Sequence, residues 1–270
     1  MKAIWFAGLL ALMPLSQAGA WGQEGHSIVA EIAQRRLDAI TLQKIRTLLG
    51  GETSLASTAS WADDVRLLRP KTAGWHFVDI PYERATYDPA VDCKEDAKRG
   101  DCVINAIARA KITLGDCSKP KQDRVEALMF LVHFVGDVHQ PLHAAERNGD
   151  HGGNDVQVTF FGRQMNLHSV WDSGIITHRV FDWGEYVRHL ESDWFPGKDI
   201  VALQGGKPED WAVESHWLAH DVAYDYPDDR NLGTDYYNKA LSVVDDQLAR
   251  AGIRLAEVLN DSLRPTASCP

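Results

Sequence analysis

The stretch from Asp123 to His143 constrains the fold more than any other part of the sequence. Its first ten residues place apolar side chains at helical spacing and predict a buried helix that runs through Asp137. His133 and Asp137 are four residues apart and therefore share one face of that helix. Pro141 cannot continue the helical hydrogen bonding, so we expect His143 to return from the exit loop. The spacing of these imidazoles and the carboxylate is typical of a metal site.

A single His/Asp pair on an apolar helix is more often a hydrogen-bonded part of the core than a ligand set, so one pair decides little. The same spacing occurs again at His168 and Asp172, at the start of another predicted helix. Two such turns, together with His143, are improbable as chance core polarity. The repetition therefore favours a metal centre.

Three further candidates are ambiguous by themselves. His26 is either an exposed residue of a frayed terminus or a ligand beside the free amine of Trp21, whose own carbonyl would complete a five-membered chelate. Asp63, beside Arg66 on a half-buried helix, is first interpreted as a solvated acid. His76 lies in an apolar run, where burial requires a partner that is a metal or a carbonyl.

Residues 1–20 have the features of a secretory signal peptide. Lys2 precedes an apolar core from Ile4 to Leu15, and Ala18-Gly-Ala20 supplies small residues for cleavage. The apolar run is too short to span a bilayer, and no later segment is long or apolar enough. We therefore expect a mature protein that begins at Trp21, lacks a membrane span, and is secreted or periplasmic.

The remaining residues, 21–270, suit one domain with a substantial core, and no repeat or linker divides them. The pattern predicts a mainly α fold, a multi-helix bundle with one small β-hairpin at Val156–Phe161 and Arg163–Leu167. A strand-like run is expected at Trp75–Pro81. Helices are expected at Ser27–Leu37, Thr41–Leu49, Ser57–Leu68, Val103–Leu114, Asp123–Asp137, Trp183–Trp194, Glu209–Tyr224 and Thr234–Ser262.

Four cysteines in an oxidising compartment predict two disulfides. Three pairings are open, and we favour Cys93–Cys102, which closes a short polar loop, with Cys117–Cys269, which tethers the C-terminus. Their spacing lacks a Cys-x2-Cys pair, which argues against zinc binding by these thiols. The formal charge is −10, and −11 once Lys2 is removed. This balance argues against nucleic-acid binding by a positively charged protein surface, although bound metal ions can reverse the sign of the charge inside a cleft.

Taken in order, the motifs resemble one family. They are Trp21-Gly-x3-His26, Trp61-Ala-Asp63, His76-Phe-x-Asp79, His133-x2-Gly-Asp137-x-His-Gln-Pro-Leu-His143, Gly152-Gly-Asn154 and Asn166-Leu-His168-x3-Asp172. This set resembles the zinc-dependent single-strand-specific nucleases, the secreted type of fungi, plants and bacteria, whose α-helical fold is related to that of zinc phospholipase C. The motifs cover Trp21 to Asp172, and beyond them only helical pattern and length agree.

The resemblance implies a cluster of three zinc ions at the bottom of a cleft. The first ion would be held by Asp63, His76, His133 and Asp137. The second would be held by His143, His168 and Asp172, and the third by the Trp21 amine and carbonyl, His26 and a bridging Asp137. Six positive charges against three aspartates leave a formal +3 where a phosphodiester must sit.

The resemblance also implies roles around that cluster. Asp63 would orient a nucleophilic water whose pKa zinc has lowered, and Arg66 would bind the developing phosphoryl charge, although a surface ion pair is an equal alternative from spacing alone. Asn154 would position the phosphate. Phe77 would stack on a base while Asp79 accepts its hydrogen bonds, which rationalises a preference for single strands.

The expected activity is hydrolysis of single-stranded DNA and RNA to 5′-phosphorylated products, with 3′-nucleotidase activity on nucleotides, by a monomer. Neither His139 nor His151 inherits a role, and we interpret both as packing around the ligands. A phospholipase C acting on phospholipid headgroups is the alternative enzyme. A zinc-sequestering or adhesion protein is the non-enzymatic alternative, which would need no open coordination position.

Overall fold

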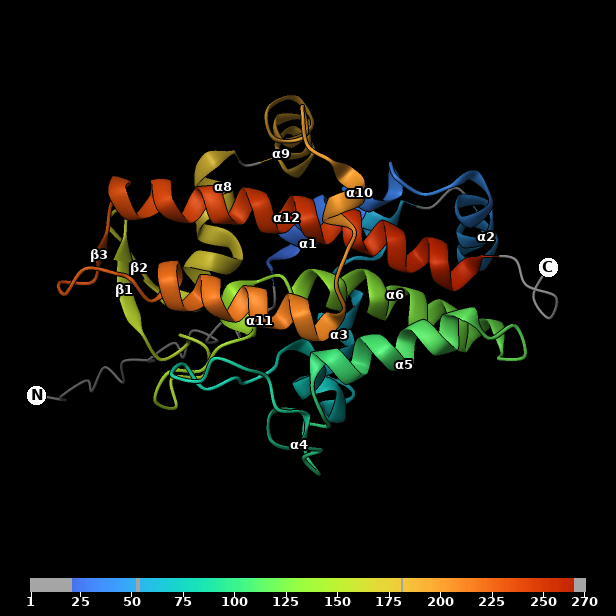
Figure 1. Cartoon of the computed structure of the whole chain (residues 1–270), viewed down its shortest axis with the longest axis horizontal. Coiled ribbons are helices and arrows are strands. Elements are labelled where there is room, and N and C mark those ends of the chain that lie inside the picture. The colour runs from blue at the N-terminus through green and yellow to red at the C-terminus, as the bar shows by residue number, and fades with distance from the viewer. Residues whose placement is uncertain (1–20, 52–53, 181, 265–270) are drawn as a thin grey trace, which may run out of the picture.

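The long C-terminal helix α12 (Thr234–Leu263) and the central helix α6 (Lys121–Asp137) organise the fold. This computed structural model describes residues 21–51, 54–180 and 182–264. Helix α1 (Gln23–Gln34) packs between α12 and α6, and α5 (Val103–Gly115) lies along α6 (Figure 1). From Leu128 to Asp137 every residue of α6 is buried or nearly so, so polar groups on this helix need partners inside the protein.

Shorter helical segments surround this core. The α-helices are α2 (Ala39–Leu49), α3 (Trp61–Arg66), α4 (Pro89–Asp92), α7 (Leu167–Ser169), α8 (Ile175–Arg179), α9 (Trp183–His189), α10 (Ile200–Leu203) and α11 (Pro208–Leu218). The tighter 3₁₀ segments are η1 (Leu55–Thr58), η2 (Pro70–His76) and η3 (Pro141–His143). Wider π-helical turns form η4 (Val170–Gly174), η5 (Leu190–Trp194) and η6 (Ala219–Ala223). The prediction of a mainly α fold is confirmed.

A small sheet closes one end of the molecule (Figure 1). Strands β1 (Gln157–Phe160) and β2 (Arg163–Asn166) form the predicted antiparallel hairpin. The two-residue strand β3 (Asn231–Leu232) adds to β1 in parallel. A segment of two residues carries no alternating pattern, so the sequence did not predict β3.

Close packing of α1 on α12 depends on Gly252. A Cβ atom there would lie 2.3 Å from Cγ2 of Ile32, so any larger residue would push the two helices apart. Helix α1 also begins earlier than predicted, at Gln23 rather than Ser27. Trp21 is fully buried and anchors the chain just before the helix, so His26 lies within the first turns of α1 and not on a frayed end.

Two segments differ from the sequence expectation. The expected helix at Ser57–Leu68 is broken at Ala59 and Ser60, between η1 and α3, and the break leaves the Ala59 carbonyl free to accept a hydrogen bond from His133. The expected strand at Trp75–Pro81 is not formed. Its first residues end η2, and the rest is extended backbone with only an isolated bridge from Pro81 to Glu146. Among the described residues, no neighbouring strand pairs with this segment along its length, so it forms no β-ladder.

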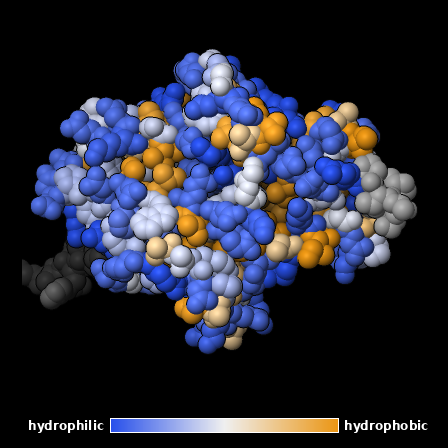
Figure 2. Space-filling model, in the orientation of Figure 1, coloured by the Kyte–Doolittle hydropathy of each residue, from blue (hydrophilic) through white to orange (hydrophobic). Residues whose placement is uncertain are grey.

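The predicted disulfide Cys93–Cys102 is present. The second predicted pairing involves Cys269, which lies outside the described residues, as does the predicted signal peptide. None of the described helices is both long and apolar enough to cross a membrane. On the face seen in Figure 2, hydrophilic residues predominate and hydrophobic ones form small separate groups.

Candidate metal centre

A cluster of imidazole and carboxylate groups lies where α1, α3, η2 and α6 meet. Helix α6 contributes His133 and Asp137, whose Nε2 and Oδ2 atoms are 3.2 Å apart. His76 places its Nδ1 3.1 Å from each of these atoms. His26 of α1 places its Nε2 3.3 Å from the other oxygen of Asp137. Three imidazoles from three separate segments therefore surround one buried carboxylate.

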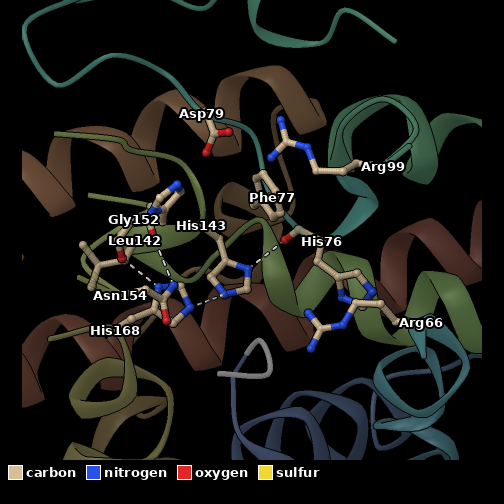
Figure 3. A pocket seen from close by; sticks show the side chains of 11 residues that line it. Arg66, His76, Phe77, Asp79, Arg99, Leu142, His143, Gly152, Asn154 and His168 are labelled. Atoms are coloured by element: carbon tan, nitrogen blue, oxygen red, sulfur yellow. Dashed lines mark hydrogen bonds between the residues drawn. The ribbon is translucent and has the colours of Figure 1, made fainter. Parts of the chain in front are cut away.

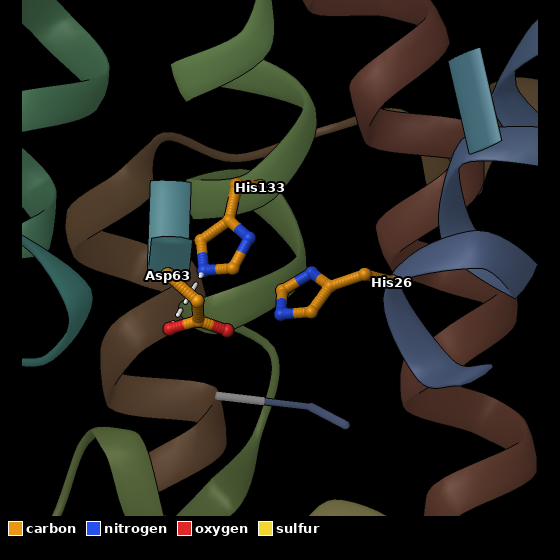
Figure 4. Close-up of side chains that lie close together, drawn as sticks. All are labelled: His26, Asp63 and His133. Carbon is orange, nitrogen blue, oxygen red and sulfur yellow. Dashed lines mark ion pairs between the residues drawn. The ribbon is translucent and has the colours of Figure 1, made fainter. Parts of the chain in front are cut away.

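The fourth member of this cluster is Asp63 of α3. Its Oδ1 lies 3.7 Å from His76 Nδ1 and 3.8 Å from His133 Nε2. Figure 4 shows Asp63, His26 and His133 pointing toward one another from different helices. The His26 ring stacks on that of His133 at 3.8 Å, and this is possible because a Cβ at Gly136 would come within 3.0 Å of His26.

The charge state of this cluster follows from its hydrogen bonds. The Nδ1 of His133 donates to the Ala59 carbonyl at 2.7 Å, so its Nε2 faces the cluster. Burial opposes charge on His133, but the adjacent Asp137 carboxylate raises the pKa of His133 to about 9. Burial likewise opposes ionisation of Asp137, yet the histidines hold its pKa well below the ordinary value. The two shifts have opposite signs, so the imidazole of His133 and the carboxylate of Asp137 each favour the charged form of the other.

A second cluster forms where η3, α7 and η4 meet. Nδ1 of His143 donates to the His76 carbonyl and Nδ1 of His168 donates to the Gly152 carbonyl, each at 2.7 Å. Both Nε2 atoms are therefore bare, and they face each other at 3.2 Å. Burial lowers the pKa of His143 to about 3 and also lowers that of His168, so neither ring gains a proton near neutral pH.

Asp172 completes the second cluster. Its Oδ2 lies 3.4 Å from His168 Nε2, and its Oδ1 lies 3.8 Å from His143 Nε2. The side chain of Gln140 donates to Oδ1 at 2.7 Å and fixes the carboxylate. Burial raises the pKa of Asp172 well above its ordinary value. Two facing lone pairs beside a carboxyl group repel one another unless a cation lies between them, so this donor set fits a metal ion.

Buried polar atoms without partners support the same conclusion. Within the described part of the chain, both ring nitrogens of His26, Nε2 of His76, and one oxygen each of Asp63, Asp137 and Asp172 make no hydrogen bond. Each such atom costs about 1–3 kcal/mol when buried. These six atoms lie in the two clusters, and the other seven such atoms of the described residues are spread over seven further side chains. Their ligand-type atoms fall into three groups, each within 4.8 Å: His26, Asp63 and His133; His76, His133 and Asp137; His143, His168 and Asp172.

One of these groups, His143, His168 and Asp172, has the same members as the set predicted for the second ion. Asp63, which was predicted to join His76, His133 and Asp137, is grouped with His26 and His133 instead. We expected His26 to share an ion with Trp21 and Asp137, whereas the structure also places it beside Asp63. Trp21 nevertheless lies at the site. It is fully buried and packs near His26, and the next residue, Gly22, donates its amide hydrogen to the Asp172 carbonyl at 2.9 Å. The N-terminal segment therefore links the two clusters.

A cavity of about 160 Å³ opens beside the clusters. His76, His143 and His168 form its floor, and Arg66 borders it with a guanidinium that approaches Asp63 to 3.8 Å (Figure 3). The walls are Phe77, Asp79, Arg99, Leu142, His151, Gly152 and Asn154. The metal-type groups are thus accessible from one side, which a catalytic centre requires and a closed storage site does not.

Comparisons with known proteins agree with this geometry. The sequence profile of the S1/P1 Nuclease family matches residues 21–264. The chain belongs to the S1/P1 nuclease family. It is 36% identical to Endonuclease 4 of Arabidopsis thaliana, over 95% of this chain and 94% of the relative. It is 32% identical to Nuclease P1 of Penicillium citrinum, over 89% and 97%, and 30% identical to Nuclease S1 of Aspergillus oryzae, over 94% and 95%.

Membership of the S1/P1 nuclease family makes this chain a hydrolase that acts on phosphodiester bonds. The family resemblance found in the motifs is thereby confirmed. The structure brings the eight predicted ligand side chains and Trp21 into one region, although their roles as ligands stay a prediction. Arg66, Phe77, Asp79 and Asn154 all line the adjacent cavity.

Several residues near this S1/P1 nuclease site were not predicted. Gln140 lies within the central motif, but a glutamine there gave no sign of its bond to Asp172. Arg99 comes from the irregular loop between two cysteines, where no periodicity points to the site. His139 packs in the interior as interpreted, with its Nε2 2.8 Å from Arg254. The interpretation of His151 was wrong, because its side chain is 70% exposed at the mouth of the cavity.

Proposed function

We propose that this chain is a zinc-dependent endonuclease that hydrolyses single-stranded DNA and RNA to 5′-phosphorylated products, with 3′-nucleotidase activity. The observation that carries the proposal is the position of the His/Asp clusters at the floor of a cavity with Phe77 on its wall. Hydrolysis needs the clusters, and selection of unpaired bases needs an aromatic ring such as that of the half-buried Phe77 on the cavity wall.

The donor set favours zinc. Imidazole nitrogens together with carboxylate oxygens are its usual ligands in catalytic sites, and the clusters contain no thiol. We assign three ions. Asp63, His76, His133 and Asp137 would hold the first. His143, His168 and Asp172 would hold the second, and His26, the backbone of Trp21 and a shared Asp137 the third. When bound, zinc supplies a Lewis acid and lowers the pKa of water toward neutrality.

The chain's own residues supply orientation and charge. The Asp63 side chain is 22% exposed, at the border between the first cluster and the cavity, where it accepts a hydrogen bond from the attacking water and orients it. Arg66 lies one helical turn away and donates to the phosphoryl oxygens as negative charge develops. Asn154 uses one amide hydrogen on the His151 carbonyl at 2.8 Å and keeps the other for the phosphate.

The base-binding part of the proposal rests on Phe77 and Asp79. A base that stacks on Phe77 must leave its own stack and pair, so duplex DNA is a poor substrate. Burial raises the pKa of Asp79 to about 6, which leaves the carboxylate ionised at neutral pH and able to accept base hydrogen bonds. Stacking itself tolerates any base, in agreement with action on both DNA and RNA.

The test compares substrates on zinc-loaded protein that begins at Trp21. Heat-denatured DNA and single-stranded RNA should be degraded, with 5′-phosphate ends on the products, while the same DNA as a duplex should be cut far more slowly. Phosphatidylcholine vesicles are the substrate that tests the alternative of a phospholipase C. Release of phosphocholine without cleavage of nucleic acid would refute the nuclease, and no turnover of either substrate would favour a zinc-sequestering protein.

Processing of the N-terminus gives a second test. Secretion with cleavage before Trp21 would create the amine that the third zinc requires. A protein that retains two residues before Trp21 should bind two zinc ions instead of three and lose activity. The same two residues added after Pro270 serve as the control. Equal metal content in all three proteins would show that the terminal amine is no ligand.

A further inference from the structure

The loop closed by the Cys93–Cys102 disulfide brings one cation to the cavity. Within the loop, Asp96 and Gly100 exchange backbone hydrogen bonds at 2.8 and 2.9 Å. The Arg99 carbonyl accepts a hydrogen bond from the Gly74 amide at 2.8 Å, on the segment η2 that ends at His76. The backbone of Arg99 is therefore held at a fixed distance from the metal-type ligands.

The side chain of Arg99 lies over the part of the cavity wall formed by Phe77 and Asp79, where the proposed function places the base. Its guanidinium carbon is 5.7 Å from the centre of the Phe77 ring. No carboxylate of the described residues lies within 4 Å of this guanidinium, whereas the neighbouring cation Arg109 is engaged by Asp101. Figure 3 shows Arg99 and Asp79 on the same side of the Phe77 ring, away from the histidines. The Asp79 carboxyl group, a hydrogen-bond acceptor, and the Arg99 guanidinium, a donor without an ion-pair partner among the described residues, thus both face the space above the Phe77 ring.

We propose that Arg99 and Asp79 together make the base pocket selective for guanine. The inference rests on the proposed nuclease function and names the base that its cavity prefers. Guanine presents two N–H donors, at N1 and N2, next to the O6 acceptor. An ionised Asp79 accepts from both donors while Arg99 donates to O6, and the ring stacks on Phe77.

Other bases match this pair less well. Adenine presents the N1 acceptor toward Asp79, which repels an ionised carboxylate, and it offers the N6 donor where Arg99 also donates. Thymine and uracil have a single N–H donor on that edge. The charged groups near Asp79 are Glu146 and Asp150, which raise its pKa, and Arg99 and His151, which lower it. Burial and these neighbours leave the carboxylate ionised above about pH 6, where the preference should be expressed.

The experiment uses zinc-loaded full-length mature protein. The substrates are oligothymidylates about eleven nucleotides long, in which the central thymine is replaced by guanine, adenine, hypoxanthine (inosine) or 2-aminopurine. We measure kcat/KM and map the bond that is cut. Cleavage next to guanine should exceed that next to adenine by roughly tenfold, because a bidentate base contact has about that discrimination. Inosine, which lacks N2, should fall between them, and 2-aminopurine, which lacks O6 and the N1 hydrogen, should resemble adenine.

Two variants separate the explanations. Arg99→Gln should reduce the guanine-to-adenine ratio to near one, while Lys98→Gln removes a positive charge from the same loop and should leave the ratio unchanged. An equal loss for all oligonucleotides in Arg99→Gln would mean that Arg99 contacts phosphate, which overturns the proposal. A ratio near one in the unmodified protein also overturns it. Absence of any cleavage would instead refute the nuclease function itself.

Discussion

Two turns of this molecule share one sequence spacing and have opposite electrostatics. His133 and Asp137 lie four residues apart on α6, and His168 and Asp172 lie four apart across α7 and η4. The histidines around Asp137 hold its pKa well below the ordinary value, whereas burial raises that of Asp172 well above it. The same i, i+4 pattern thus lowers the pKa of the carboxyl group in one turn and raises it in the other.

The difference comes from what each turn packs against. Asp137 has His26, His76 and His133 around it, and its charge raises the pKa of His133 to about 9. Asp172 faces two rings whose inner nitrogens are bare, and its direct hydrogen-bond donor is the neutral amide of Gln140. Spacing therefore predicts which groups meet, while neighbours from distant segments decide their charge.

The largest expected effect separates these two turns. In the proposed site, Asp137 would be the carboxylate shared by the first and third zinc ions, so Asp137→Asn should lower the metal content from three to one. Activity should fall by on the order of 10⁴-fold, as for loss of a central catalytic group. Asp172→Asn should remove one ion only, with activity on the order of 10³-fold lower. Metal analysis and kcat/KM on denatured DNA measure both. Equal metal loss in the two variants would contradict the bridging role of Asp137.

Arg66 tests whether the clusters act as one site. It approaches Asp63 to 3.8 Å, and its charge also acts on His168 and Asp172 in the other cluster. Arg66→Gln should lower kcat by roughly 10²–10³-fold with zinc content unchanged, because a donor to developing charge is lost. Arg66→Lys should recover part of the rate. Arg69→Gln, which breaks an exposed pair with Glu126, is the control. A change confined to KM would show that Arg66 binds substrate only.

Substitution of Gln140 tests the difference between the two clusters with a smaller expected effect. Its amide orients Asp172 and touches no ligand of the first cluster, so Gln140→Leu should weaken the affinity for one zinc by about 10–100-fold. Gln247→Leu is the matched control, because Gln247 is equally buried but donates to the His139 carbonyl and Ser215. Competition with a chromogenic chelator measures the affinities. Equal weakening in both variants would point to a general loss of stability.

The sequence predicted which His and Asp side chains come together, because helical geometry fixes the relative positions of several of them. Once α6 is recognised as a helix, His133 and Asp137 must share a face, and Pro141 forces the turn that returns His143. Long patterned helices such as α12 were predicted nearly to their ends for the same reason. The order of the motifs identified the family, and this supplied Asp63 and His76, which spacing alone left ambiguous.

What the sequence missed depends on contacts between distant segments. The break at Ala59, which frees a carbonyl for His133, has no local signal, because the flanking residues suit a continuous helix. Arg99 reaches the cavity through a loop shaped by the disulfide and by the Gly74 amide. The exposure of His151 follows from its loop, not from its residue type. These residues lie in irregular backbone, whose conformation cannot be predicted from hydrophobic periodicity.

Asp79 extends the lesson of Asp172 to a carboxylate outside the clusters. Burial, assisted by the Glu146 charge, raises its pKa from 3.8 to about 6. A carboxyl whose pKa is higher in the folded protein stabilises the fold only at low pH, and that contribution is lost as the pH rises from about 4 to 6. Above pH 6 the ionised group therefore lowers the free energy of unfolding relative to a neutral one.

Asp79→Asn should remove this cost. The variant should be more stable than the unmodified protein by about 2 kcal/mol above pH 7, which is somewhat less than the full pKa difference gives, since the site opens to solvent. The advantage should vanish near pH 4, where both side chains are neutral and of similar size. Urea unfolding of zinc-loaded proteins between pH 4 and 8 measures it, with Glu83→Gln, an exposed acid on the same segment, as control. Zinc loss at low pH affects both proteins alike, so the difference between their free energies of unfolding reports on Asp79 alone. If that difference did not change with pH, burial at the cavity wall would not control the ionisation of Asp79.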